Sequence, residues 1–106
     1  ARSDDMIISS GYNIAGPEVE AALMAHPSVS ECAVVGIPDK ERGSLVKAFI
    51  VLRDGTEENE AMKQTLQDFV KKTIAPYKYP RSIEFRKSLP KTETGKIQRF
   101  RLREGG

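Results

Sequence analysis

The sequence predicts an α+β (small α/β) domain with a short N-terminal hairpin and a small mixed sheet covered by helices. Three observations predict it: short apolar or alternating segments typical of strands, two segments with helical spacing, and Pro or Gly at the boundaries between them. The chain has 106 residues, 39% hydrophobic and 30% charged, which is enough for one domain with a modest core. The order hairpin, helix, strand, strand, helix, strand and tail is typical of such a domain.

The N-terminal elements begin with a hairpin, in which residues 6–8 return through residues 12–14 after the turn pair Ser10-Gly11. Gly16-Pro17 predicts the start of a helix, because the N–H that proline lacks is not needed in the first turn. Pro27 marks the end of that helix.

The central elements are two strands and a second helix. The apolar run at 32–37 predicts a buried strand, residues 45–52 predict another, and residues 38–43 predict a polar loop between them. Apolar residues spaced as on one helical face predict a helix over 59–73: Met62, Leu66, Phe69 and Val70. Alternation around Ile83 and Phe85 predicts a last strand, and the basic segment 97–103 a final helix.

Charge is unevenly distributed along the chain. Residues 1–70 contain 6 Lys and Arg against 12 Asp and Glu, whereas residues 71–106 contain 11 against 3. A basic end of this kind has three interpretations: a solvated surface, a nucleic-acid site, or a site for a phosphorylated small molecule.

Single reactive residues give little indication of chemistry. Cys32 lies in an apolar run and is interpreted as a small buried hydrophobe; the single cysteine fits a reducing, cytoplasmic location. His26, before Pro27, is interpreted as a structural or surface histidine, and the sequence has no Cys/His pattern for zinc. The segment 90–97 presents Lys96 after a flexible Thr-Gly turn, where an ammonium can meet a carboxylate or phosphate.

Three separated motifs nevertheless resemble one family, in family order and over nearly the whole chain. The first runs from Arg2 through Ile14 to Glu18-Val19-Glu20, the second combines Pro38-Asp39, Arg42-Gly43 and Val46-Lys47-Ala48, and the third combines Leu89-Pro90-Lys91-Thr92 with Gly95-Lys96-Ile97. The chain resembles the C-terminal domain of the adenylate-forming (AMP-binding) superfamily of acyl-CoA synthetases. Residues 75–81 look most like medium-chain and aromatic acid–CoA ligases of the benzoate or 2-aminobenzoate type.

The resemblance implies that residues 1–106 form the mobile C-terminal lid of an ATP-dependent carboxylic acid–CoA ligase, without its large N-terminal domain, and inactive alone. The implied partners are that domain, a carboxylic acid, ATP with Mg²⁺ and CoA, with neither nucleic acid nor membrane. Such lids rotate between adenylation and thioester formation.

The resemblance also implies roles for single residues. Lys96 is the implied catalytic lysine of adenylation and a contact of ATP, and a candidate for a protein acetyltransferase; Asp4 is the implied hinge. Gly11 is implied to line the pantetheine tunnel. The full set of implied CoA contacts is Ser10, Gly11, Tyr12, Arg42, Lys71, Tyr79, Pro80 and Arg81.

Two positions depart from the family pattern. Ala1 stands where the hinge motif usually begins with glycine, and Asn13 stands where many relatives place an arginine on the ATP phosphates. Asn13 is therefore expected to make a shorter, uncharged contact with ATP. The alternative function is a stand-alone basic module that binds nucleotide or nucleic acid through residues 71–103, although that region lacks an aromatic RNA-binding pattern.

Overall fold

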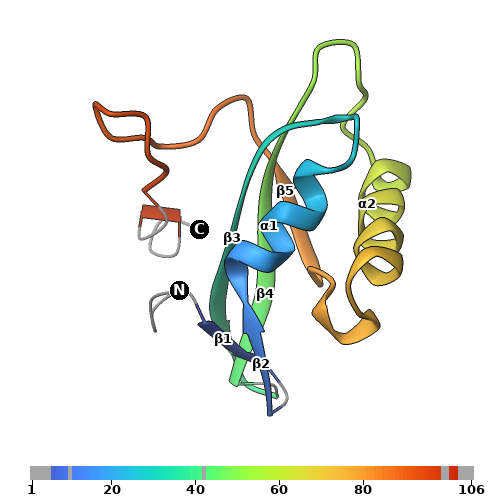
Figure 1. Cartoon of the computed structure of the whole chain (residues 1–106), viewed down its shortest axis with the longest axis vertical. Helices are drawn as coiled ribbons and strands as arrows, with labels where there is room; N and C mark the ends of the chain where they lie inside the picture. The colour runs from blue at the N-terminus through green and yellow to red at the C-terminus, as the bar shows by residue number, and fades with distance from the viewer. Residues whose placement is uncertain (1–5, 10, 42, 99–100, 103–106) are drawn as a thin grey trace.

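The computed structural model describes residues 6–9, 11–41, 43–98 and 101–102 of the chain (Figure 1). Its elements are β1 (Met6–Ser9), β2 (Tyr12–Ala15), α1 (Gly16–Met24), β3 (Val29–Asp39), β4 (Gly43–Leu52), α2 (Glu60–Thr73), the 3₁₀ turn η2 (Pro76–Lys78) and β5 (Ser82–Phe85). The α+β class predicted from the sequence is confirmed, and the predicted elements from the N-terminal hairpin to the last strand follow in the predicted order.

Two separate sheets build the domain. β1 and β2 form an antiparallel hairpin, whereas β3, β4 and β5 form a three-stranded sheet with β4 in the centre. β4 pairs antiparallel with β3 and parallel with β5, so α2 is the crossover between two parallel strands. The sheet is therefore mixed, as predicted.

The turn between β3 and β4 is tighter than the sequence predicted. Pro38 and Asp39 continue β3, and Gly43 already begins β4 as the partner of Asp39. A proline fits here because β3 is the edge strand, where a missing N–H costs no ladder bond on the open side. Gly43 has φ +81°, a left-handed conformation that glycine adopts without strain.

Helix boundaries follow local chemistry. The Asn59 side chain accepts a hydrogen bond from the Met62 N–H at 2.9 Å and caps α2. α1 begins with Gly16-Pro17, as predicted. At its end, His26 accepts a hydrogen bond from the Ser28 N–H through Nδ1 (3.1 Å) and packs edge-on against Phe69, so it joins α1 to α2.

The three-stranded sheet is buried on both faces, because alternate residues of each strand point to opposite sides. One face packs against α1 and α2, with Val34 and Ile50 meeting Leu23 and Leu66. The other face packs against the C-terminal segment through a second buried cluster, which we call the Phe49 cluster: Ala33, Val35, Phe49, Leu89 and Leu102. Figure 1 shows this segment crossing to the side of the sheet away from α2.

The final helix predicted at 97–103 is wrong at its start. Ile97 forms an antiparallel bridge with Lys91, and helical geometry is described only at Arg101 and Leu102. Residues 99, 100 and 103 lie outside the described ranges. Ile97 packs at the edge of the Phe49 cluster, and this burial replaces the local helical pattern.

Candidate functional site

Lys96 directly follows the loop of a small hairpin, which we call the lysine hairpin (Lys91–Ile97). The Gly95 N–H donates to the Thr92 carbonyl at 2.9 Å, and the Thr92 N–H donates to the Lys96 carbonyl at 2.8 Å. Gly95 has φ +88°, as expected for the left-handed residue that closes a three-residue hairpin loop. The Lys96 side chain is exposed.

The turn is more ordered than the sequence predicted. The Thr92 hydroxyl accepts a hydrogen bond from the Lys96 N–H at 3.2 Å and lies 2.9 Å from the Thr94 hydroxyl. The Gln98 N–H donates to the Pro90 carbonyl at 2.8 Å and closes the base of the hairpin. The backbone under Lys96 is therefore fixed, and the ammonium can move only through its own four-carbon chain.

Two contacts attach the lysine hairpin to the sheet. Ile97 packs against the Phe49 cluster, in which Leu89, just before the hairpin, is buried. The Lys91 ammonium lies 2.5 Å from the Glu31 carboxylate on β3. The hairpin is thus carried as part of the domain, and movement of the whole domain would move Lys96 with it.

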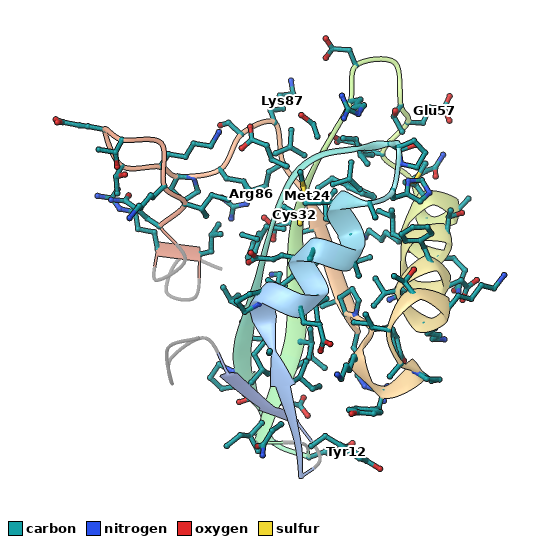
Figure 2. The ribbon with its side chains drawn as sticks, in the orientation of Figure 1. Tyr12, Met24, Cys32, Glu57, Arg86 and Lys87 are labelled. Atoms are coloured by element: carbon teal, nitrogen blue, oxygen red, sulfur yellow. The ribbon has the colours of Figure 1, made fainter. Side chains whose placement is uncertain are left out.

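The predicted CoA residues come from the opposite part of the domain. Figure 1 shows the β1–β2 turn and η2 at one end, and the lysine hairpin at the other end on the far side of the sheet. Figure 2 shows Tyr12 at the end away from Lys87 and Glu57. The structure therefore brings together several predicted CoA residues but separates them from Lys96.

Tyr79 is held between two cations that belong to the predicted CoA set. The Lys71 ammonium lies 4.3 Å from the ring centre, and the Arg81 guanidinium lies 4.9 Å from it. Arg81 also donates from Nη1 to the Tyr79 hydroxyl at 2.9 Å. These contacts orient two positive groups around one half-buried ring, and Lys and Arg are groups that suit phosphate.

Pro80 differs from its neighbours because it is fully buried. Its carbonyl accepts a hydrogen bond from the Gln67 side chain at 3.0 Å. In this arrangement Pro80 supports the residues on either side of it; contact of its ring with CoA stays a prediction.

Gly11 lies at the turn of the β1–β2 hairpin with φ +83°. A Cβ added there would meet nothing within 4 Å, so a side chain would project into open space. Asn13 lies exposed on β2, paired in register with Ile8. Asp4, Ser10 and Arg42 lie outside the described residues, so their predicted roles receive no structural account.

Part of the charge asymmetry is balanced inside the domain. The Lys78 ammonium lies 2.6 Å from the Glu18 carboxylate, and Lys91 pairs with Glu31, so basic residues of the C-terminal part meet acidic residues of the N-terminal part. The hydrogen bond that Lys78 donates to Glu18 raises the pKa of Lys78, against a smaller opposing effect of burial. Sequence reasoning missed these pairs because no local pattern connects their members.

Glu84 is the centre of a second charged group on the sheet. Its carboxylate lies 3.2 Å from the Lys47 ammonium and 2.7 Å from Arg86 Nε. Both cations also lie over the Phe49 ring. Burial raises the pKa of Glu84, but the hydrogen bonds from Arg86 and Lys47 outweigh it and hold that pKa below its ordinary value.

Two classes of site are not found in the described part of the chain. Over residues 6–9, 11–41, 43–98 and 101–102, no three His, Cys, Asp or Glu side chains come together as a metal-binding group. Among the helices of the same ranges, none has the length and apolar character needed to cross a bilayer.

The fold places the exposed Lys96 on a hydrogen-bonded hairpin. Comparison with known proteins gives the family of this domain. Residues 18–96 match the model of the AMP-binding enzyme C-terminal domain. The chain therefore belongs to this family. The match supports the predicted family and not the alternative of a nucleic-acid-binding module.

Relatives of known name agree with the family. The chain is 56% identical over 106 residues to the mitochondrial acyl-coenzyme A synthetase ACSM3 of Mus musculus, covering 98% of this chain and 18% of the relative. It superposes on the Brucella canis acyl-CoA synthetase with TM-score 0.95 and 50% identity, over 99% of this chain and 19% of that one.

A further solved relative is the anthranilate CoA ligase AuaEII in complex with anthranoyl-AMP. The TM-score is 0.89 and the identity 48%, over 99% of this chain and 20% of that one. The chain thus spans about a fifth of the length of the relatives it matches.

Proposed function

We propose that this domain is the mobile lid of an AMP-forming carboxylic acid–CoA ligase, whose catalytic lysine is Lys96. The observation that carries the proposal is an exposed lysine directly after the loop of a hydrogen-bonded hairpin, in the sequence context of the family motif. Relatives of this family are named as acyl-CoA synthetases and CoA ligases, which supports the same reaction class.

In the first half-reaction, a carboxylate oxygen attacks the α-phosphorus of ATP, and the bond to pyrophosphate breaks. Negative charge then concentrates between the carboxylate, the α-phosphate and the leaving group. The Lys96 ammonium stabilises that charge without accepting or losing a proton. Mg²⁺ bound to the ATP phosphates would supply further neutralisation.

In the second half-reaction, the CoA sulfur attacks the acyl carbon of the acyl-adenylate, and AMP leaves. Tyr12, Lys71, Tyr79 and Arg81 are the described residues that we assign to CoA, with Gly11 beside the pantetheine. Lysines and arginines suit the phosphates of CoA. Ser10, Pro80 and Arg42 stay predicted members of this set.

The separation of the two residue sets in Figure 1 supports rotation of the domain between the half-reactions. The lysine hairpin and the region of the β1–β2 hairpin and η2 lie at opposite ends of a domain measuring 38 × 34 × 23 Å, so the two regions are different faces of the lid. Rigid rotation about a short hinge would present these faces to the active site in turn. Asp4 stays the predicted hinge, and the larger N-terminal domain is the partner against which the lid moves.

The substrate class that we propose is a medium-chain or aromatic carboxylic acid. It rests on the resemblance of residues 75–81 and on the anthranilate ligase among the similar structures. Acetylation of Lys96 and a cytoplasmic location stay predictions; exposure of the Lys96 side chain is compatible with a modifying enzyme.

The test uses the full-length protein with ATP, Mg²⁺, CoA and a panel of aliphatic and aromatic acids. We expect acid-dependent exchange between pyrophosphate and ATP, and CoA-dependent release of AMP. Exchange without thioester formation would refute CoA as the acceptor, and absence of both activities with every acid would refute the ligase.

A further inference from the structure

Tyr77 is an exposed aromatic residue outside the set of predicted CoA contacts, and it stacks on a member of that set. The ring centres of Tyr77 and Tyr12 lie 4.5 Å apart at an interplanar angle of 26°. The two residues remain 42% and 53% exposed, so the pair is a surface feature and not part of the buried core. An exposed tyrosine in the Tyr12 position would otherwise exchange between rotamers in water.

The position of Tyr77 is itself fixed by an ion pair with the neighbouring helix. Lys78, the next residue in η2, lies 2.6 Å from the Glu18 carboxylate in the first turn of α1. The same ammonium lies 5.7 Å from the centre of the Tyr77 ring. Because α1 follows β2 directly, η2 is attached to the unit that carries Tyr12.

The backbone of η2 limits the remaining freedom. Pro76 begins the turn with its φ fixed by the ring, and the Lys78 N–H donates to the Ala75 carbonyl at 3.1 Å. Tyr79, two residues after Tyr77, is held by Lys71 and Arg81. One short segment therefore orients Tyr12 through Tyr77 on one side and carries the Tyr79 group on the other.

We propose that Tyr77 is a positioning residue for CoA binding: it holds the Tyr12 ring in the orientation that binds CoA. The Glu18–Lys78 ion pair in turn fixes the position of Tyr77. The inference rests on the proposed function, since it assigns Tyr12 to the CoA site. Tyr77 acts before CoA arrives, by reducing the ordering that Tyr12 must undergo on binding. Its effect belongs to the thioester half-reaction and leaves adenylation unchanged.

The experiment compares Tyr77→Ala, Tyr77→Phe and wild type in the full-length enzyme. Loss of one stacked aromatic pair corresponds to a change of about 2- to 10-fold in a binding equilibrium. We expect Tyr77→Ala to raise KM for CoA by that factor, with little change in kcat, in KM for ATP or in the rate of pyrophosphate exchange. Tyr77→Phe should restore KM for CoA, because the ring remains.

A second variant tests the support of Tyr77. Lys78→Met removes the charge but keeps a side chain of similar length, and should raise KM for CoA in the same direction by a smaller factor. Met24→Ala is the matched control for Tyr77→Ala, since Met24, like Tyr77, is an exposed large hydrophobic residue (47%). Met24 lies at the C-terminal end of α1, away from Glu18 in the first turn (Figure 2). This variant should leave both half-reactions unchanged.

The outcomes separate the two levels of inference. An unchanged KM for CoA in Tyr77→Ala, or equal losses in both half-reactions, would overturn the positioning role alone. Failure of Tyr77→Phe to restore KM would also overturn it, because stacking would not be the cause. A wild-type enzyme that forms acyl-adenylate but no thioester would overturn the proposed function, and the inference with it.

Discussion

Lys96→Ala is the sharpest test of the lysine hairpin, because the structure separates its chemical role from any structural one. The side chain of Lys96 is exposed, and both hydrogen bonds of this residue in the turn use its backbone. Truncation at an exposed site of this kind changes the free energy of unfolding by no more than about 0.5 kcal/mol. The hairpin should therefore keep its shape without the ammonium.

The expected effect on adenylation is large. Removing one preorganised charge-stabilising group typically costs about 10²–10³ in rate, or about 2.7–4 kcal/mol of transition-state stabilisation. Thioester formation from a supplied acyl-adenylate should change little, because the lysine hairpin lies at the end of the domain away from the β1–β2 hairpin and η2 (Figure 1).

The assay measures the two half-reactions separately in the full-length enzyme. Pyrophosphate exchange reports adenylation, and release of AMP from added acyl-adenylate and CoA reports thioester formation. Lys87→Ala is the matched control, since it removes another exposed lysine of the same C-terminal segment (Figure 2). Adenylation near the wild-type rate in Lys96→Ala would refute the catalytic role, and equal losses in both half-reactions would indicate a structural one.

Further predictions concern other parts of the domain. Gly11→Leu should slow thioester formation far more than Gly11→Ala, since both variants strain the same φ of +83° but only leucine fills the space that CoA needs; equal effects in a CoA titration would point to strain alone. Asn59→Ala should lower the free energy of unfolding by about 1 kcal/mol in urea denaturation, and Asn59→Asp should not, because both Asn and Asp cap helices. The folded-state pKa of Glu84 is lowered, so its stabilisation is present at neutral pH and is lost as pH falls through that pKa. Near neutral pH, Glu84→Gln should therefore lower the free energy of unfolding by less than about 1 kcal/mol relative to wild type, and this difference should disappear in acid. A difference that stays constant with pH would contradict an origin in the ion pair. The isolated 106-residue chain should form no acyl-CoA with any acid, ATP and CoA.

Local patterns of the sequence were sufficient for the individual elements. The spacing of Met62, Leu66, Phe69 and Val70 predicted α2, because a helix of 3.6 residues per turn needs one apolar stripe. Proline and glycine located the start of α1 and the hairpin turn through their backbone preferences. The third motif identified Lys96 as the residue to examine, and the family is confirmed over residues 18–96.

Predictions were weakest where a segment depends on distant partners. Residues 97–103 have a pattern compatible with a helix, but Ile97 instead pairs with Lys91 at the edge of the Phe49 cluster. Burial against another part of the chain outweighs a weak local preference, and the sequence does not show which surface a segment will meet.

The sequence by itself determined the fold class, the family motifs and the lysine expected to act on ATP, since each depends on residues close together in the chain. Only the tertiary structure decided that the sheet is buried on both faces and that the lysine hairpin and the β1–β2 hairpin lie at opposite ends of the domain. It also decided that Tyr77 stacks on Tyr12 and that Lys78 pairs with Glu18. The physical reason is that such contacts join residues more than fifty positions apart, whose meeting depends on strand pairing and packing and not on local periodicity.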